Sequence, residues 1–268
     1  PVLPAVGFVE MMVAACHNSG LSQLSNSQLS NPKLNVPQLQ ANSPVLTLAD
    51  ISFATPLYLD AAASVQVTIN EQNESNELIV ARQTSGNQWG THSKARFSSS
   101  SENQNSTYQP LQQENKIRPA DVYQRLAEQS VTYGTDWRLL HSVSVQDNQI
   151  DAEIRLPERL DNAFFFPPIV LDASVQSLAA LFVDQQRGET FLPEGIGRVD
   201  FYTDRLQGET FTSRALVTSG SDWLSANILL FDGQGTLQVA MTDFRLRPIR
   251  LSADAHPQTP SVKPPAQE

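Results

Sequence analysis

Two segments of this chain follow the same plan, in which prolines lead into an apolar stretch and strand-like runs come after it. The first apolar stretch is AVGFVEMMVAAC (5–16), directly behind Pro4, and Gly20 lies just beyond its end. The second comes after the run FFFPP and is expected to be helical over 172–183. Proline is favoured at the start of a helix and glycine just past its end. The pattern therefore predicts a core helix in each half of the chain.

Strand-like runs follow both helices. In the first half they are 45–59, 64–70, 77–83 and 89–97. In the second half, after a further predicted helix at 118–129, they include GRVDFYTD, TFTSRALVTS, SANILLFD and TLQVAMTDFRLRPI, with FDGQG as a hairpin turn. Alternation of period two, clearest in VQVTI, is typical of antiparallel strands with one exposed face. A long helix wrapped by an antiparallel sheet is the hotdog layout. We therefore expect an α+β double hotdog, with two such subdomains in tandem.

Polar stretches set the expected boundaries. An N-terminal hotdog subdomain is expected over 1–100, with a polar insertion at about 18–44 that nearly repeats SQLSN. Residues 101–117 are expected to form a linker, residues 118–252 a C-terminal hotdog subdomain, and residues 253–268 a Pro-rich tail. Because ligand sites favour junctions between such units, a tunnel is expected where the two subdomains meet.

Composition excludes several classes of function. The formal net charge of −10 argues against nucleic acid or an anionic membrane surface as a partner. The lone cysteine, Cys16, excludes an internal disulfide and a cysteine metal cluster, and no metal site is predicted. No run approaches the roughly 20 apolar residues of a membrane span, and no signal peptide is visible, so a cytoplasmic location is expected. Because Pro1 opens in what looks like the middle of an element, the chain is expected to be part of a longer protein.

Asp172 is conspicuous because a packed helix normally carries an apolar residue at such a position. Gln176 follows one turn later on the same helix face. The local sequence allows two interpretations. Aspartate at a helix N-terminus is a common capping residue, worth about 0.5–2 kcal/mol. Alternatively, the carboxyl group belongs to an active site.

Several motifs in a fixed order resemble the dehydratase domains of modular polyketide synthases. VLPAVGFVEMMVAA (2–15) resembles the second half of that family's His-x3-Gly-x4-Pro-Gly motif, with Pro4 at the motif's proline and Ala5 where glycine is usual. VTYGTDWRLLHSV (131–143) resembles Tyr-Gly-Pro-x-Phe, with Thr135 and Trp137 at the last two named positions. The ordered set covers nearly the whole chain apart from the polar insertions and the tail.

Two further motifs complete the set. PPIVLDASVQ (167–176) resembles His-Pro-x-Leu-Leu-Asp-x3-Gln/His, with Pro167 in place of histidine. LPEGIGRV (192–199) resembles the Leu-Pro block that follows in the family. Arg198 in this block is expected to be a surface arginine, with contact to a carrier's phosphate as the less favoured alternative.

The resemblance implies roles for particular residues. Asp172 would be the acid that protonates the departing β-hydroxyl group, and Gln176 would orient it by hydrogen bonding. The family's base, a histidine, would lie ahead of Pro1, so the catalytic histidine is not present in this chain. The residues expected to line the substrate tunnel are Tyr133, Gly134, Pro4 and Leu3. The histidines that match no motif position are His17, His92, His141 and His256.

The implied function is elimination of water from a β-hydroxyacyl group on acyl carrier protein, giving an α,β-unsaturated acyl chain. No cofactor is expected, since the substrate is carried on the phosphopantetheine of the acyl carrier protein. The expected partners are that carrier and neighbouring synthase domains, and a homodimer is compatible with the resemblance. The departures at Ala5, Thr135 and Pro167 leave a diverged member open, one that shifts a double bond, closes a pyran ring or acts as a chain-branching scaffold. A non-catalytic acyl-binding module is the third alternative.

Overall fold

The structure of the chain is a computed structural model. It describes residues 2–21, 44–59, 64–72, 75–84, 87–99, 108–111, 115–157, 163–183, 190–220 and 223–249. The helices are α1 (Ala5–Asn18), α2 (Pro119–Glu128) and α3 (Pro168–Gln176), with 3₁₀ segments η3 (Thr135–Trp137) and η4 (Ser177–Phe182). The strands are β1 (Leu46–Phe53), β2 (Val65–Gln72), β3 (Ser75–Gln83), β4 (Trp89–Ser99), β5 (Asn115–Ile117), β6 (Leu140–Gln146), β7 (Gln149–Arg155), β8 (Thr190–Phe201), β9 (Thr210–Ser219), β10 (Leu224–Asp232) and β11 (Leu237–Ile249).

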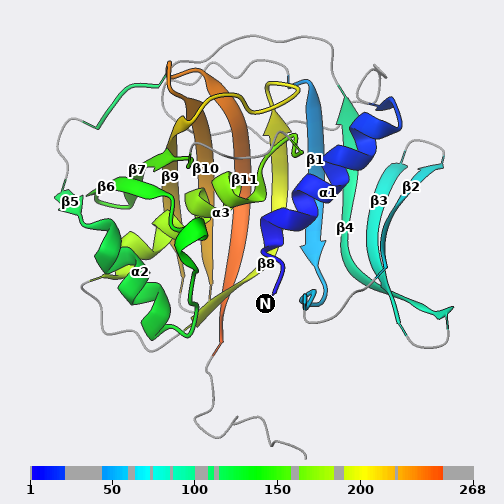
Figure 1. Cartoon of the computed structure of the whole chain (residues 1–268), viewed down its shortest axis with the longest axis horizontal. Helices are drawn as coiled ribbons and strands as arrows, with labels where there is room; N and C mark the ends of the chain where they lie inside the picture. The colour runs from blue at the N-terminus through cyan, green and yellow to red at the C-terminus, as the bar shows by residue number, and fades with distance from the viewer. Residues whose placement is uncertain are drawn as a thin grey trace, which may run out of the picture.

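The described strands form one continuous sheet in which neighbours run antiparallel. Its order is β2-β3-β4-β1-β8-β11-β10-β9-β7-β6-β5, so β1–β4 lie on one side and β5–β11 on the other (Figure 1). The two halves meet where β1 pairs with β8, with Leu48 opposite Val199. Within the sheet, the two halves are therefore joined by backbone hydrogen bonds between β1 and β8. Elsewhere in the sheet, the hairpin turn expected at FDGQG connects β10 to β11, and Asp232 Oδ1 accepts the backbone N–H groups of Gln234 and Thr236 at 2.9 Å each.

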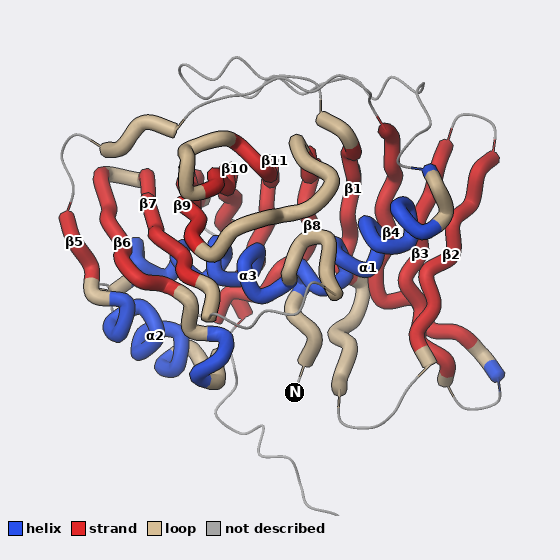
Figure 2. Tube along the Cα trace, turned by 45° about the horizontal axis from the view of Figure 1, so that its top comes forward, coloured by secondary structure: helices blue, strands red, loops and turns tan. Residues whose placement is uncertain are grey.

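Helices α1 and α3 lie on the same side of this sheet (Figure 2). Helix α1 packs against β2 and β3, and α3 packs against β7, β9 and β10. The two helices also contact each other. Each half thus has the expected layout of a helix wrapped by an antiparallel sheet. Among the described helices, none combines the length and apolar character needed to cross a membrane.

The hydrophobic core is shared by both halves. Phe8 of α1, Leu171 of α3, Phe201 of β8 and Phe244 of β11 belong to one cluster, and each is at most 2% exposed. Burial of a side chain of this size stabilises the fold by about 1.5–3 kcal/mol. The helices are therefore held in place by a core that does not stop at the boundary between the halves.

The expected linker, 101–117, is described only at 108–111 and 115–117. Residues 115–117 are β5, which pairs with β6. Tyr108 packs against Phe231, with ring centroids 5.3 Å apart, and its hydroxyl group donates to Asp151 Oδ2 at 2.6 Å. The expected tail and most of the polar insertion lie outside the described residues, and the division into subdomains at these boundaries stays a prediction.

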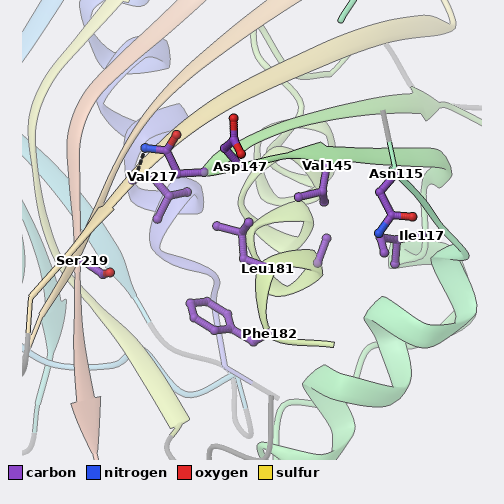
Figure 3. A pocket seen from close by; sticks show the side chains of 10 residues that line it. Asn115, Ile117, Val145, Asp147, Leu181, Phe182, Val217 and Ser219 are labelled. Atoms are coloured by element: carbon purple, nitrogen blue, oxygen red, sulfur yellow. Dashed lines mark hydrogen bonds between the residues drawn. The ribbon is translucent and has the colours of Figure 1, made fainter. Parts of the chain in front are cut away.

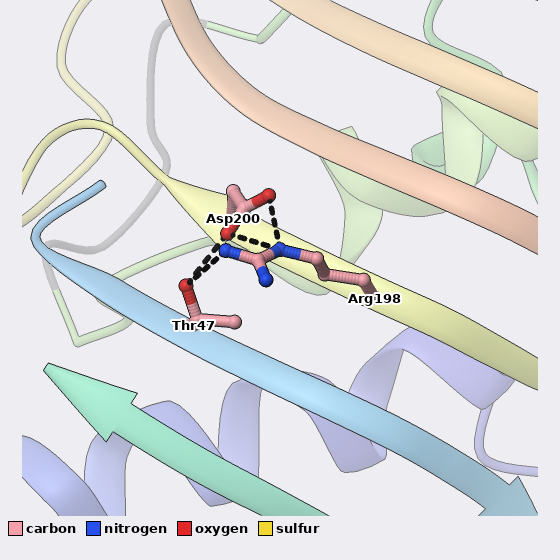
Figure 4. Close-up of polar contacts among 3 residues, drawn as sticks. All are labelled: Thr47, Arg198 and Asp200. Carbon is pink, nitrogen blue, oxygen red and sulfur yellow. Dashed lines mark hydrogen bonds and ion pairs between the residues drawn. The ribbon is translucent and has the colours of Figure 1, made fainter. Parts of the chain in front are cut away.

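A polar trio joins β1 to β8 (Figure 4). Arg198 Nε donates to both carboxylate oxygens of Asp200, at 2.8 and 2.7 Å, and Thr47 Oγ1 donates to Asp200 Oδ1 at 2.6 Å. Arg198 and Asp200 are 7% and 3% exposed. The expectation of a surface arginine at position 198 is therefore wrong, because the Asp200 carboxylate satisfies the guanidinium group inside the protein. Removing one partner of such a buried pair costs about 3–5 kcal/mol.

Candidate active site

Asp172 lies inside helix α3 and not at its start. Proline is compatible with a helix N-terminus because the first N–H groups have no partner there, and α3 begins at Pro168 with Pro167 as the N-cap. The helix thus starts earlier than the expected position 172, and its last part, Ser177–Phe182, is 3₁₀. Asp172 sits one turn beyond Pro168 and is 6% exposed. The helix-cap interpretation of this acid is wrong.

Two side chains donate hydrogen bonds to the Asp172 carboxyl group. Gln176 Nε2 donates to Asp172 Oδ2 at 2.7 Å and also approaches the Trp137 carbonyl oxygen at 3.2 Å. The Tyr133 hydroxyl group is the second donor. Gln176 Oε1 is buried, and no donor among the described residues reaches it. The structure therefore brings together three of the residues singled out in the sequence.

Burial controls the protonation of this group. Loss of water contact raises the pKa of Asp172 from 3.8 to about 6, while the hydrogen bonds from Gln176 and Tyr133 act in the opposite direction. Burial also raises the pKa of Tyr133 far above its ordinary value, and the nearby Asp172 charge adds to this effect. Tyr133 consequently remains a hydrogen-bond donor, and Asp172 can exchange a proton near neutral pH.

Tyr123 of α2 is a neighbour of this site that the sequence motifs did not indicate. Its hydroxyl oxygen accepts the backbone N–H of Leu140 at 3.1 Å. Burial raises its pKa to about 12, and the Asp172 charge contributes to the rise. Arg138 lies over the Tyr123 ring, 5.5 Å from its centroid, and its Nε donates to the Tyr133 carbonyl oxygen at 3.0 Å. The segment that carries Tyr133 is thereby attached to α2.

The other expected tunnel residues lie at the start of two elements. Pro4 is the N-cap of α1, and the backbone N–H of Leu3 donates to the Leu57 carbonyl oxygen at 2.9 Å. Gly134 is the N-cap of η3, with φ −66° and ψ 163°, an extended conformation open to any residue. Their role as tunnel lining stays a prediction.

The described histidines occupy separate places. His17 stacks on Phe165 with ring centroids 4.2 Å apart. His92 Nδ1 lies 3.0 Å from the hydroxyl oxygen of Thr55, and His141 is exposed on β6. His256 lies outside the described residues.

A cavity of about 310 Å³ lies beyond the C-terminal end of α3 (Figure 3). Apolar side chains from η4, β5, β6 and β9 form much of its lining, and Asp172 is not among its walls. The lining residues are Asn115, Ile117, Val145, Asp147, Asn148, Ala180, Leu181, Phe182, Val217 and Ser219. This cavity is therefore distinct from the immediate surroundings of the acid.

Two helix-and-sheet units joined edge to edge, with a buried carboxyl group on α3, define a double-hotdog protein with an acidic centre. Residues 101–256 match the family described as "Polyketide synthase dehydratase N-terminal domain". The match covers more than half of the chain. The chain belongs to the polyketide synthase dehydratase family.

Individual proteins agree with this assignment. The chain is 24% identical over 260 residues to mycoketide-CoA synthase of Mycobacterium tuberculosis, a match that covers 92% of the chain and 6% of that synthase. It is similar to the dehydratase domain from the CurJ module of curacin polyketide synthase, with a TM-score of 0.72, 23% identity and coverage of 92% and 83% of the two chains. The dehydratase domain of RzxB from Pseudomonas fluorescens gives a TM-score of 0.76, 21% identity and coverage of 92% and 86%. These structures confirm the double-hotdog fold.

Proposed function

We propose that this domain removes water from a β-hydroxyacyl thioester, with Asp172 as the general acid. The observation that carries the proposal is a buried carboxyl group with two hydrogen-bond donors, in a member of the polyketide synthase dehydratase family. With its pKa at about 6, Asp172 is protonated in about 10% of molecules at neutral pH, against less than about 0.1% for an exposed aspartate. A general acid works best when its pKa lies near the working pH.

The reaction needs a base as well as an acid. A base removes the α-proton, the C–H electron pair forms the α,β double bond, and the C–O bond breaks as Asp172 protonates the departing hydroxyl group to give water. We assign the base to the family's histidine, which the motif places ahead of Pro4 and before Pro1. In support, CurK dehydratase has been crystallised as an inactive His-to-Phe mutant and as an inactive Asp-to-Asn mutant. A positioned acid and a positioned base each contribute about 10²–10⁴-fold to such a reaction.

Gln176 and Tyr133 would act through Asp172. Once the acid has given up its proton, their donors face a full carboxylate, and hydrogen bonds to a charged acceptor are stronger than those to a neutral one. They would therefore stabilise the acid's product form while fixing its orientation. We further propose that Leu3, Pro4 and Gly134 line the path of the acyl chain.

The proposed substrate is carried on the phosphopantetheine of an acyl carrier protein, so the domain itself would need no cofactor. Neighbouring synthase domains would be its partners, and tethering to them would raise the effective substrate concentration. The chain corresponds to 6% of the mycoketide-CoA synthase length, so these partners are inferred from the family.

The test uses a chain extended upstream to include the motif's histidine, with a β-hydroxyacyl group loaded on acyl carrier protein. Mass spectrometry should detect loss of one water from the acyl group, and Asp172→Asn should lower the rate at least about 100-fold. Asp136→Asn, at an exposed carboxyl group of η3, is the matched control and should keep its rate. An unchanged acyl mass with a folded wild-type domain would contradict the proposal. A shifted double bond or a ring in the product would identify a diverged member instead.

A further inference from the structure

Glu10 is a buried acid that the proposed reaction does not use. It lies on α1 among apolar residues and is 5% exposed. Both of its carboxylate oxygens accept backbone N–H groups from the other half of the chain, Oε1 from Phe165 and Oε2 from Phe166, each at 2.8 Å. Carboxylates are seldom fully buried unless they are paired. Here the partners are two consecutive backbone amides.

These two amides occupy a particular place in the chain. Pro167 and Pro168 follow them, and prolines have no N–H group. Helix α3 begins at Pro168. Glu10 therefore binds the last backbone donors before the helix that carries the acid.

Side-chain packing also holds the segment 164–166 in place. The Phe165 ring is stacked on His17 of α1, 4.2 Å away, and the Arg205 guanidinium lies 4.4 Å from its centroid. Arg205 also donates to the Phe164 carbonyl oxygen at 2.8 Å. Phe166 is fully buried, and its ring centroid lies 4.4 Å from that of Phe201. The segment that leads into α3 therefore has little freedom once Glu10 holds its amides.

The geometry points to Glu10 as a positioning residue that sets where α3, and with it Asp172, lies relative to α1. Asp172 is one turn from the start of α3, so a displacement of that start is passed along a rigid helix to the carboxyl group. The catalytic consequence rests on the proposed function, because an acid misplaced by about 1 Å loses on the order of 100-fold in rate. The structural consequence does not depend on it.

The first test needs no substrate. In Glu10→Gln the side chain keeps its size, but its NH₂ group faces one of the two backbone N–H groups in place of an acceptor. NMR titration of labelled aspartate carboxyl groups, with Asp172 assigned by its absence in Asp172→Asn, should give an altered pKa for Asp172 in this variant. If Glu10→Gln does not fold, Glu10→Asp keeps the charge on a shorter side chain and should alter the same pKa by pulling on the two amides.

The matched control is Asp200→Asn, which also removes a buried acid but acts on β1 and β8 through Thr47 and Arg198. It should lower stability and leave the Asp172 titration unchanged. Glu10 variants that lose stability as this control does, with an unchanged Asp172 titration, would overturn the inference.

The second test measures turnover in the extended chain. Glu10→Gln should lower kcat by about 10–100-fold with KM changed by less than about 2-fold, and Asp200→Asn should keep kcat for the folded fraction. Equal kcat in wild type and Glu10→Gln would overturn the inference. If the wild type itself releases no water, the proposed function has failed, and the titration alone decides the role of Glu10.

Discussion

Replacing Asp172 with asparagine should make the domain increasingly more stable than the wild type as the pH rises. Burial holds the pKa of Asp172 at about 6, against 3.8 for an exposed aspartate. Because the folded-state pKa is raised, the stability that this group contributes is fully present below pH 3.8 and is lost as the pH rises through 6. At about 1.4 kcal/mol per pH unit the whole loss is about 3 kcal/mol. About 2 kcal/mol of it falls between roughly pH 4.5 and roughly pH 7.

Asparagine cannot titrate, so the difference in unfolding free energy between variant and wild type should grow by about 2 kcal/mol over that range. The asparagine oxygen still accepts a hydrogen bond from Gln176 or Tyr133, and the loss of the other bond lowers the stability of the variant by about 1 kcal/mol. The stronger hydrogen bonds to the ionised acid of the wild type are already included in its pKa of about 6, so they do not change the expected growth of the difference with pH. Burial also raises the pKa of Glu10, to about 7, but Glu10 titrates in both proteins and cancels in the difference.

Urea unfolding curves at a series of pH values measure this difference directly. The exposed residue Asp136 provides a control, since Asp136→Asn also removes one negative charge. A difference that stays constant with pH, or shrinks as the pH rises, would refute the argument that Asp172 is a desolvated acid in the folded protein. The same result would remove the main physical support for its role as a proton donor.

Tyr133→Phe removes one donor to Asp172 and should therefore raise the pKa of that acid above about 6, which NMR titration of labelled aspartates detects; an unchanged or lower pKa would exclude the hydrogen bond. Gly195→Ala should destabilise the domain by about 2 kcal/mol or more, because a Cβ atom at Gly195 would lie 2.5 Å from the backbone oxygen of Ile51. Gly134→Ala is its control, with no atom within 4 Å of the added Cβ, and equal thermal unfolding temperatures for the two variants would contradict the steric argument.

The local pattern was sufficient to predict two of the helices and most strands, whereas the helix expected at 172–183 begins at Pro168 and is 3₁₀ over Ser177–Phe182. The helix expected at 5–16 is observed as Ala5–Asn18, and the one expected at 118–129 as Pro119–Glu128. Alternating side chains do not specify a partner strand, and many strands of this chain alternate in the same way. The pairing of β1 with β8 therefore could not be predicted, although it determines how the halves are joined.

At the site, the sequence could predict a hydrogen bond only where both of the bonded groups are side chains. Asp172 and Gln176 are spaced one helical turn apart, so their contact can be predicted from the sequence. Glu10 is likewise a single acid in an apolar helix, but its hydrogen-bond partners are backbone amides. Every residue except proline has a backbone amide, so the sequence does not indicate which of them Glu10 binds. Arg198 looks like an exposed residue of a strand. Its burial depends on Asp200, two residues further along the same strand β8, and on Thr47 of the neighbouring strand β1.

Because β1 and β8 are neighbours in one sheet, separating the two halves of the chain would leave β1 and β8 each without the strand it pairs with. A fragment that ends after β4 would expose the unpaired N–H and C=O groups of β1, and its counterpart would expose those of β8. Exposed strands of this kind recruit other chains and aggregate. The two fragments should consequently be insoluble alone and should complement each other when produced together. Recombination between relatives is constrained in the same way, since exchanging one half succeeds only if the new β1 and β8 match in length and in the positions of their side chains.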